Sequence, residues 1–224
     1  MQSILTIFWT ILVLIAAPLA GILSRRPLAA RARPRSLVYA GSAMNLILIA
    51  GITAAIDLWR GGESIRALMP VLSASRFLMW TIAISLVCIV IYLLRAKLNR
   101  PPSAIVMSLL PETSAEYVFF LALCVLVGLV EEFLFRGFAL STLADLSGSK
   151  MLAAAIVTIS FALQHGIQDA IGIVRAFVLG VVLVVPVLVT GSLLPSIVAH
   201  ALVDAFSGLF GRAMIERLGI VLPK

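Results

Sequence analysis

The chain has 224 residues, of which 62% are hydrophobic and 12% charged, and its mean hydropathy is +1.17. Soluble domains contain about 45–50% apolar and about 25% charged residues, so this composition excludes a water-soluble globular protein. The net charge of +7 does not indicate nucleic-acid binding, because the basic residues lie between apolar runs and are not interleaved with aromatic residues. Cys88 and Cys124 both lie inside apolar runs, and we expect no disulfide.

The first apolar run, Ile4–Leu23, is long enough for a helix to cross a hydrocarbon core about 30 Å thick. A cleaved signal peptide is the alternative, but no Lys or Arg precedes the run. Six further runs follow in chain order: Leu37–Ile56, Phe77–Leu94, Tyr117–Leu143, Met151–His165, Gly172–Thr190 and Leu193–Phe210. Because backbone amides in lipid must be satisfied within the element, we predict helices. The expected fold class is all-α, a polytopic membrane helix bundle with about seven transmembrane helices, in a range of six to eight.

Basic residues are unevenly distributed among the predicted loops, which predicts the orientation of the chain. They are concentrated in the first loop, the third loop and the tail, namely Arg25, Arg26, Arg31, Arg33, Arg35, Arg95, Lys97, Arg100, Arg212, Arg217 and Lys224. The intervening loops hold fewer, although Arg60, Arg66 and Arg76 weaken the contrast. Since positive charge marks the cytoplasmic side, we expect the N-terminus outside and the C-terminus in the cytoplasm, in a bacterial cytoplasmic membrane. The proline-containing loop 99–116 is expected to lie along the interface.

Ionisable residues interrupt three of the apolar runs, and each costs about 2.5–3.5 kcal/mol at membrane depth. They are Glu131, Glu132 and Arg136 in the fourth run, His165 at the end of the fifth, and His200 and Asp204 in the seventh. Residues four apart share a helix face, so Glu132 is predicted to pair with Arg136, and His200 with Asp204. Glu131 is rotated by about 100° from Glu132 and is left as the carboxylate available for chemistry.

Structural roles compete with functional ones for several of these residues. The Glu132–Arg136 pair is expected to fix the helix rather than to react, and Asp204 to orient the His200 ring. By the rise per residue, Glu131, His165 and His200 could meet in the middle to cytoplasmic half of the bundle. Outside this set we expect core packing for Phe161, helix-end positions for Asp57, Asp169 and Arg175, and an interhelical hydrogen bond for Asn45.

A buried glutamate beside two imidazoles is suited to activate water for attack on a carbonyl group. His165 and His200 could bind a divalent metal such as zinc, with Asp204 or Glu131 as a further ligand. They could equally act without metal, one positioning the water with Glu131 and the other forming an oxyanion hole with Asp204. The sequence lacks the H-E-x-x-H helix of common zinc proteases, so both routes stay open.

Three motifs occur in order on separate predicted helices: Glu-Glu-x-x-x-Arg (Glu131, Glu132, Arg136), Phe-x-x-x-His (Phe161, His165) and His-x-x-x-Asp (His200, Asp204). Together they resemble the CAAX protease and bacteriocin-processing family, also called the Abi family of intramembrane proteases. The similarity includes flanking segments such as Leu109-Leu110-Pro111 and covers about residues 109–210. Residues 1–108 have no motif match, and residues 211–224 are expected to form a short cytoplasmic tail of the same membrane domain.

The resemblance implies a membrane endopeptidase similar to type II CAAX prenyl endopeptidases. In it Glu131 would activate water with His165, while His200 and Asp204 would stabilise the oxyanion or bind metal. Family members often have Asn at the position of Asp204, so Asp here favours a metal-binding or His-orienting role. The implied partners are membrane lipid and a membrane-associated peptide or protein, which could be lipidated. The alternative is a non-catalytic membrane scaffold or immunity protein of the same fold, and a proton-coupled transporter ranks last because no paired halves are visible.

Overall fold

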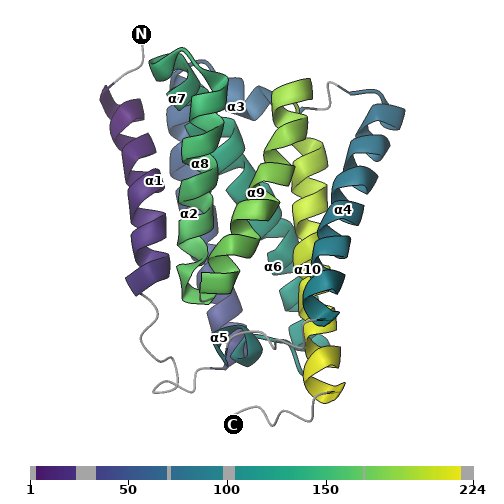
Figure 1. The fold of residues 1–224 in the computed structure, drawn as a ribbon. Coiled ribbons are helices and arrows are strands. Elements are labelled where there is room, and N and C mark those ends of the chain that lie inside the picture. The colour runs from purple at the N-terminus through teal and green to yellow at the C-terminus, as the bar shows by residue number, and fades with distance from the viewer. Residues whose placement is uncertain (1–3, 24–33, 70–71, 98–103, 169, 218–224) are drawn as a thin grey trace.

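The computed structural model describes residues 4–23, 34–69, 72–97, 104–168 and 170–217, and the regular structure in these residues is entirely helical. The elements are α1 (Ile4–Leu23), α2 (Arg35–Trp59), α3 (Glu63–Arg66), α4 (Ala74–Lys97), α5 (Ala104–Ser108), α6 (Ser114–Glu131), η2 (Glu132–Ala139), α7 (Leu140–Ser147), α8 (Lys150–Gln164), η3 (His165–Gln168), α9 (Ala170–Thr190) and α10 (Leu194–Arg217). Within the described residues, 7 helices are long and apolar enough to cross a membrane. The predicted fold class is confirmed, and the helices form one upright bundle (Figure 1).

Each predicted run corresponds to one crossing, but some boundaries differ from the prediction. α1 has the predicted bounds, whereas α10 continues to Arg217 instead of ending at Phe210. The predicted tail 211–224 therefore begins as helix. Several residues used in the predictions lie outside the described part of the chain: Arg25, Arg26, Arg31, Arg33, Arg100, Asp169 and Lys224.

The helix that carries the first motif starts earlier than the hydropathy indicates. α6 begins at Ser114 because Thr113 and Glu116 form a capping box. The Thr113 hydroxyl accepts a hydrogen bond from the Glu116 backbone N–H at 3.2 Å, and the Glu116 carboxylate accepts one from the Thr113 N–H at 3.2 Å. This T-x-x-E signal fixes the entry of the helix that positions Glu131.

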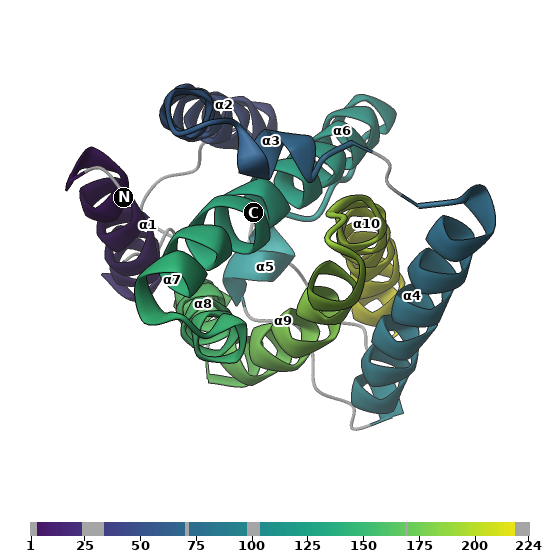
Figure 2. The same ribbon diagram turned by 90° about the horizontal axis from the view of Figure 1, so that it is seen from above.

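α6, η2 and α7 form a single span of 34 residues, Ser114–Ser147. A straight helix of that length measures about 50 Å, well beyond a hydrocarbon core of about 30 Å, so it must tilt. Figures 1 and 2 show it crossing the middle of the bundle, with α6 at one edge and α7 on the opposite side. The η2 segment is π-helical, an irregularity that is frequent at functional sites. Residues 132–140 are all buried, so the first motif lies at the centre of the fold.

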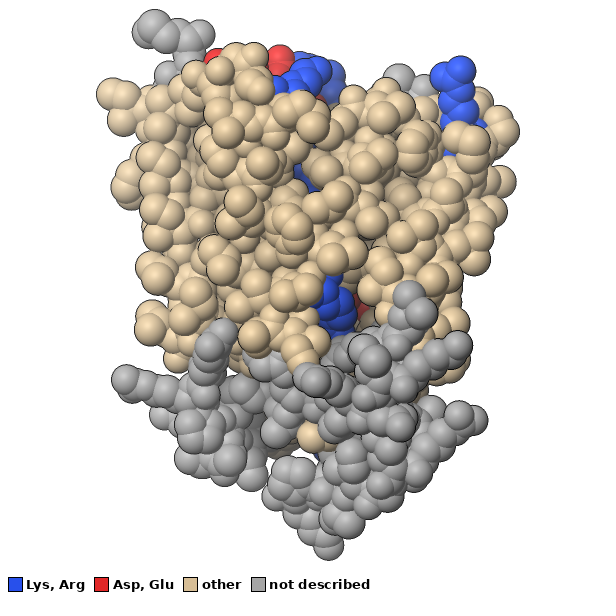
Figure 3. All heavy atoms as spheres, in the orientation of Figure 1, with Lys and Arg blue, Asp and Glu red and all other residues tan. Residues whose placement is uncertain are grey.

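α1 is an integral member of the bundle. Trp9 Nε1 donates a hydrogen bond to Thr53 Oγ1 of α2 at 2.8 Å, and Ser160 Oγ of α8 donates one to the Leu14 carbonyl at 2.8 Å. α4 lies at the periphery, against α10 (Figure 2). The outward-facing side chains of the long helices are mostly large and apolar, and Figure 3 shows a face that is largely uncharged between its two ends. The protein is an integral membrane protein.

The short helix α5 lies across the end of the bundle at which α6 begins (Figure 1). Two side chains of α2 bind the carbonyl groups at the end of α5. Arg35 Nε donates to the Ser108 carbonyl at 2.9 Å, and Tyr39 Oη donates to the Leu109 carbonyl at 2.5 Å. Arg35 also forms an ion pair with Glu112 at 2.7 Å. These contacts fix the described part of the loop predicted to lie along the interface.

Candidate active site

The three motifs, which are separate in sequence, come together between α6, α8 and α10. The backbones of α6 and α10 approach closely at Gly128, where an added Cβ would lie 2.9 Å from the Ile197 carbonyl oxygen and 3.0 Å from the Ala201 nitrogen. Only glycine allows the backbones of α6 and α10 to approach so closely. One turn further along α6, this crossing brings Glu131 and Glu132 to His200.

Glu132 is the centre of the buried polar cluster and is fully inaccessible to solvent. Its Oε1 accepts a hydrogen bond from Arg136 Nη1 at 3.1 Å, which confirms the predicted pair within one helix. The same oxygen lies 2.8 Å from His200 Nδ1, a contact that the sequence did not predict. The predicted contact between His200 and Asp204 is present, with Asp204 Oδ2 3.6 Å from His200 Nε2, but this is beyond hydrogen-bonding distance, so Asp204 does not orient the ring as expected. Glu132, the first residue of η2, therefore orients His200 through Nδ1, whereas Asp204, on α10 with His200, faces Nε2.

Phe161 covers the cluster, in agreement with the core-packing role predicted for it. It is 2% exposed, and the guanidinium of Arg136 lies 4.0 Å from the centre of its ring. Its ring centroid is 4.9 Å from that of His165 and 5.8 Å from that of His200. On the far side, Gly180 of α9 leaves room for the guanidinium, since a Cβ there would lie 3.2 Å from Arg136 Nη2. The Arg136 side chain is thus held by packing as well as by its ion pair.

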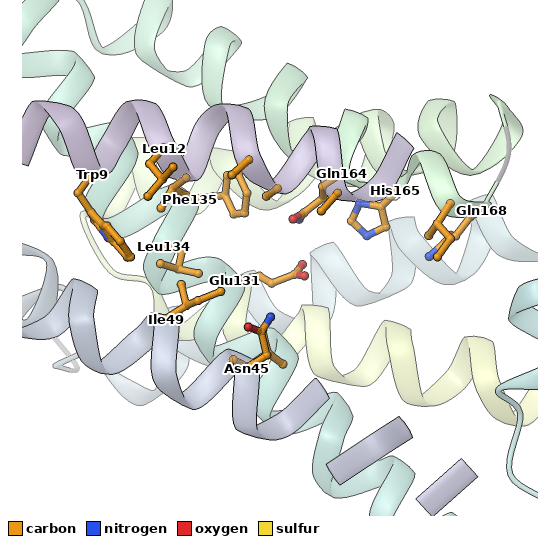
Figure 4. A pocket seen from close by; sticks show the side chains of 16 residues that line it. Trp9, Leu12, Asn45, Ile49, Glu131, Leu134, Phe135, Gln164, His165 and Gln168 are labelled. Atoms are coloured by element: carbon orange, nitrogen blue, oxygen red, sulfur yellow. The ribbon is translucent and has the colours of Figure 1, made fainter. Parts of the chain in front are cut away.

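Glu131 differs from Glu132 in having few polar contacts. Its side chain is 17% exposed, and its Oε2 lies 3.9 Å from His200 Nε2. That oxygen is buried and has no hydrogen-bond partner among the described residues. His165 Nδ1 lies 2.9 Å from the Phe161 carbonyl oxygen, so Nδ1 carries the donated proton and Nε2 is left as an acceptor. Figure 4 shows Glu131 and His165 both pointing into a cavity.

Two cavities meet at Glu131, His165 and Gln168, which line both of them. The larger, about 600 Å³, is bounded by α1, α2 and the core of η2 and is mostly apolar, with Trp9 and Leu12 among its walls. The smaller, about 230 Å³, lies between α6, α9 and α10 and has more polar walls. Glu131 therefore separates an apolar chamber from a polar one.

The cavities also include residues that sequence reasoning missed or interpreted differently. Asn45, expected to bridge two helices, is exposed and lines the larger cavity. Arg175, expected at a helix end, lines the smaller one from the second turn of α9. Gln164 and Gln168 also line the cavities, and the sequence analysis did not predict them as site residues. Their amides lie close in sequence to His165, and this proximity could have identified them. Asp57 does lie near the end of α2, as predicted.

The side chains around His165 and His200 include the donor types that zinc uses, so their grouping decides whether they could hold a metal ion. Among the described residues, no three His, Cys, Asp or Glu side chains are grouped so as to hold a metal ion. The Nδ1 atoms of both histidines are engaged, with Phe161 and Glu132 respectively. A hydrolytic zinc site uses about three protein ligands, and the donors present here do not form such a set.

The bundle gathers a glutamate and two histidines at the junction of two cavities. Residues 113–206 match the family model described as Type II CAAX prenyl endopeptidase Rce1-like. This match confirms the resemblance inferred from the three motifs, and it contains all six of the predicted site residues, Glu131, Glu132, Arg136, His165, His200 and Asp204. Over that segment the chain is similar to CAAX-protease-type membrane endopeptidases. No curated protein and no solved structure matches the chain.

Proposed function

We propose that the protein hydrolyses a peptide bond of a membrane-associated peptide or protein, including lipidated ones, with Glu131 as the general base. The observation that carries the proposal is the position of the Glu131 carboxylate. It lies where the two cavities join, faces His200, and has a buried oxygen that no described residue hydrogen-bonds. A buried carboxylate with unused acceptor capacity is suited to bind and deprotonate a water molecule.

The proposed reaction assigns a task to each ring nitrogen that faces the cavities. Water is held between Glu131 and His165 Nε2, and Glu131 takes its proton as the oxygen attacks the scissile carbonyl carbon. His200 acts in its imidazolium form: Nδ1 donates to Glu132, and Nε2 donates to the oxyanion that develops on the former carbonyl oxygen. When the carbon–nitrogen bond breaks, the proton held by Glu131 passes to the departing amine. A carboxylic acid and a free amine result, and the carboxylate is regenerated.

The neighbouring residues position these groups and do not react in this scheme. Glu132 fixes the ring of His200 through Nδ1, as carboxylates commonly orient histidines at reactive sites. Arg136 balances the charge of Glu132, so that the buried carboxylate is paired. We assign Asp204 to the wall of the smaller cavity beside His200 Nε2.

We further propose that this chemistry proceeds without a resident metal. Support comes from the donor set, because the described side chains do not group as a three-ligand site. The zinc route, with His165 and His200 as ligands, is the alternative.

The orientation proposed from the sequence is supported by the order of the spans. With 7 crossings in the described residues, the two ends of the chain lie on opposite sides. The connections on the C-terminal side hold most of the basic residues, whereas those on the other side hold Arg60, Arg66, Arg76 and Lys150. We therefore propose that the N-terminus is outside and the C-terminus cytoplasmic, in the cytoplasmic membrane of a bacterium.

Replacement of Glu131 by glutamine tests the proposed function. The purified protein in lipid nanodiscs is incubated with a library of S-alkylated peptides, and cleavage is followed by mass spectrometry. Glu131→Gln should lower kcat/KM by about 100- to 10,000-fold, the usual contribution of a general base, while the melting temperature stays unchanged. Glu63→Gln, at an exposed carboxylate of α3, is the matched control. Equal cleavage by Glu131→Gln and the parent would favour the non-catalytic scaffold.

A further inference from the structure

Three amide side chains line the larger cavity, and two of them have no hydrogen-bond partner among the described residues. Gln168 is engaged, because its Oε1 accepts a hydrogen bond from Arg175. Gln164, the last residue of α8, has a buried Nε2 without an acceptor. Asn45 of α2 is exposed in the cavity wall, and its amide forms no hydrogen bond with a described residue. The proposed reaction uses neither Gln164 nor Asn45.

Both unused amides belong to helices that cross the membrane. Asn45 comes ten residues after Arg35, where α2 begins, and is therefore about 15 Å along the helix, near the middle of the span. Within a membrane, Asn and Gln side chains commonly form hydrogen bonds to a neighbouring helix. Polar groups that stay unpaired at this depth are costly, so their presence indicates a ligand that pairs with them.

The two amides lie on opposite sides of the Glu131 carboxylate. Figure 4 shows Gln164 and His165 on one side of Glu131 and Asn45 on the other, with the Asn45 amide pointing toward the carboxylate. The backbone of Gln164 is fixed in this position, because Gly21 of α1 packs directly on its carbonyl group and a Cβ there would overlap it. The cavity between the amides therefore has one hydrogen-bonding group on each wall.

A trans peptide group fits between two amides placed in this way. Because the group is planar and trans, its N–H and C=O bonds point in opposite directions. Gln164 Nε2 can donate to the C=O, and Asn45 Oδ1 can accept from the N–H on the opposite side. Each unused amide then gains a partner, and the bound peptide group lies beside Glu131.

We infer that Asn45 and Gln164 form a binding site for the main chain of the substrate, which holds the peptide group next to the scissile one from both sides. This inference rests on the proposed function. The bound group orients the neighbouring carbonyl carbon toward the water at Glu131. Because every residue except proline carries the same main-chain groups, the site accepts varied side chains. A helical segment has its N–H and C=O groups bonded internally, so the substrate must enter as an extended chain.

Other roles for the two amides make different predictions. If Asn45 and Gln164 only stabilise the bundle, their removal affects every substrate equally. A lipid acyl ester offers a carbonyl oxygen but no N–H, so it would engage Gln164 and leave Asn45 unused. If both residues bind the substrate main chain, their removal affects only substrates in which the bound peptide group is intact.

The test replaces single peptide groups of the substrate by esters, which lack the N–H and have a weaker carbonyl acceptor. A short peptide with one S-hexadecyl cysteine is made with an ester at each peptide bond in turn, and the cleaved bond is mapped by mass spectrometry and left as an amide. With the parent protein in nanodiscs, an ester next to the cleaved bond should lower kcat/KM by about 3- to 30-fold, as expected for one or two neutral hydrogen bonds. Equal rates for the all-amide peptide and every ester would overturn the inference.

Variants of matched size assign the effect to the two residues. Asn45→Leu and Gln164→Met remove the hydrogen-bonding atoms and keep the side-chain volume. The combined variant should bring the ratio of the all-amide and ester rates near one by slowing the all-amide peptide, and each single variant should retain part of the ratio. Ser42→Ala, at an exposed serine of α2 that lines neither cavity, should keep the parental ratio. A parental ratio in Asn45→Leu, as expected for a lipid ester at Gln164, would overturn the inference.

A binding measurement separates a failure of this inference from a failure of the proposed hydrolysis. The same peptides, labelled with a fluorophore, are titrated with Glu131→Gln protein, and fluorescence anisotropy reports the dissociation constant. The all-amide peptide should bind about 3- to 30-fold more tightly than one of the esters, and the additional Asn45→Leu and Gln164→Met substitutions should remove the difference. If no peptide is cleaved but this preference is seen, catalysis fails while the main-chain site stands. Equal binding of all the peptides would reject the site.

Discussion

Two carboxylate–arginine pairs lie in the interior of the described part of the chain, and they differ in how many of their polar atoms have hydrogen-bond partners. At the end of α2, Asp57 accepts from the backbone N–H groups of Ser64 at 3.3 Å and Ile65 at 3.0 Å and pairs with Arg60 at 3.5 Å. Arg60 in turn donates to Ser141 and Thr142. Both carboxylate oxygens and the guanidinium thus have partners that join α2, α3 and α7.

The Glu132–Arg136 pair at the centre of the bundle is less complete. Glu132 Oε2, Arg136 Nε and Arg136 Nη2 are buried without a hydrogen-bond partner among the described residues, as is Glu131 Oε2 beside them. Each arginine lies over a phenylalanine ring, Arg60 at 5.1 Å from that of Phe138 and Arg136 at 4.0 Å from that of Phe161. The two arginines are therefore packed in a similar way, but only the Asp57–Arg60 pair has hydrogen-bond partners for its polar atoms. A buried polar group left unpaired costs about 1–3 kcal/mol, so its persistence points to function, whereas the completed Asp57 pair points to structure.

The largest expected effect on stability is at the completed pair. Asp57→Ala removes the acceptor of two backbone N–H groups and leaves Arg60 without its carboxylate, which should lower the free energy of unfolding by about 3–5 kcal/mol. The cleavage rate per folded molecule should be unchanged, because the site lies elsewhere in the bundle. Thermal unfolding in detergent measures the first quantity. Glu63→Ala, at an exposed carboxylate of α3, is the control and should change stability by less than about 0.5 kcal/mol.

At the incomplete pair, a loss of activity should exceed the loss of stability. Glu132→Gln keeps an oxygen for His200 Nδ1 but removes the charge that Arg136 faces, and we expect kcat to fall about 10- to 100-fold, as for other groups that orient a reactive histidine. Combining it with Arg136→Gln should restore most of the lost stability but not the rate, since the uncompensated charge is removed. Additive stability losses in this double-mutant cycle would show that the two side chains are not coupled.

Asp204→Asn is expected to have a small effect. Asp204 does not hold the His200 ring, because Glu132 does, and an amide preserves its shape. We expect kcat/KM to stay within about threefold of the parent value, a change of less than about 0.7 kcal/mol in the activation free energy. A loss of a hundredfold or more would mean that the charge of Asp204 is required, as it would be for a metal ligand.

Removing metal ions with a chelator should change the cleavage rate less than any of these substitutions. If Glu131 activates water directly, incubation with EDTA and dialysis should leave the cleavage rate unchanged, and the purified protein should contain less than one zinc per molecule by mass spectrometry. His200→Ala should then alter the rate without altering metal content. Zinc bound in stoichiometric amount by the parent and lost in His200→Ala would instead establish the zinc route.

Much of the fold was predictable because the signals that define it are local. α1 has the predicted bounds, and the other long helices follow the predicted runs to within a few residues at most ends. The Glu132–Arg136 pair was predictable as well, since residues four apart share a helix face. The start of α6 was readable from Thr113 and Glu116, although hydropathy alone placed it later.

Other features depend on how the helices pack. The bond between Glu132 and His200 joins residues 68 positions apart and exists because α6 and α10 cross closely at Gly128. The position of Arg175 in the smaller cavity depends likewise on where α9 lies against α6 and α10. No periodicity in the sequence reports such a crossing.

The sequence by itself determined that the chain spans a membrane, with about seven helices, and which of its ionisable residues lie within them. Hydropathy and helical spacing are properties of a single segment, so they can be determined from its sequence alone. The tertiary structure decided which carboxylate holds His200, which one faces the cavities, and how the apolar and polar cavities share Glu131. These outcomes depend on the tilt of α6 and on the contacts between helices, and such contacts are set by the whole bundle.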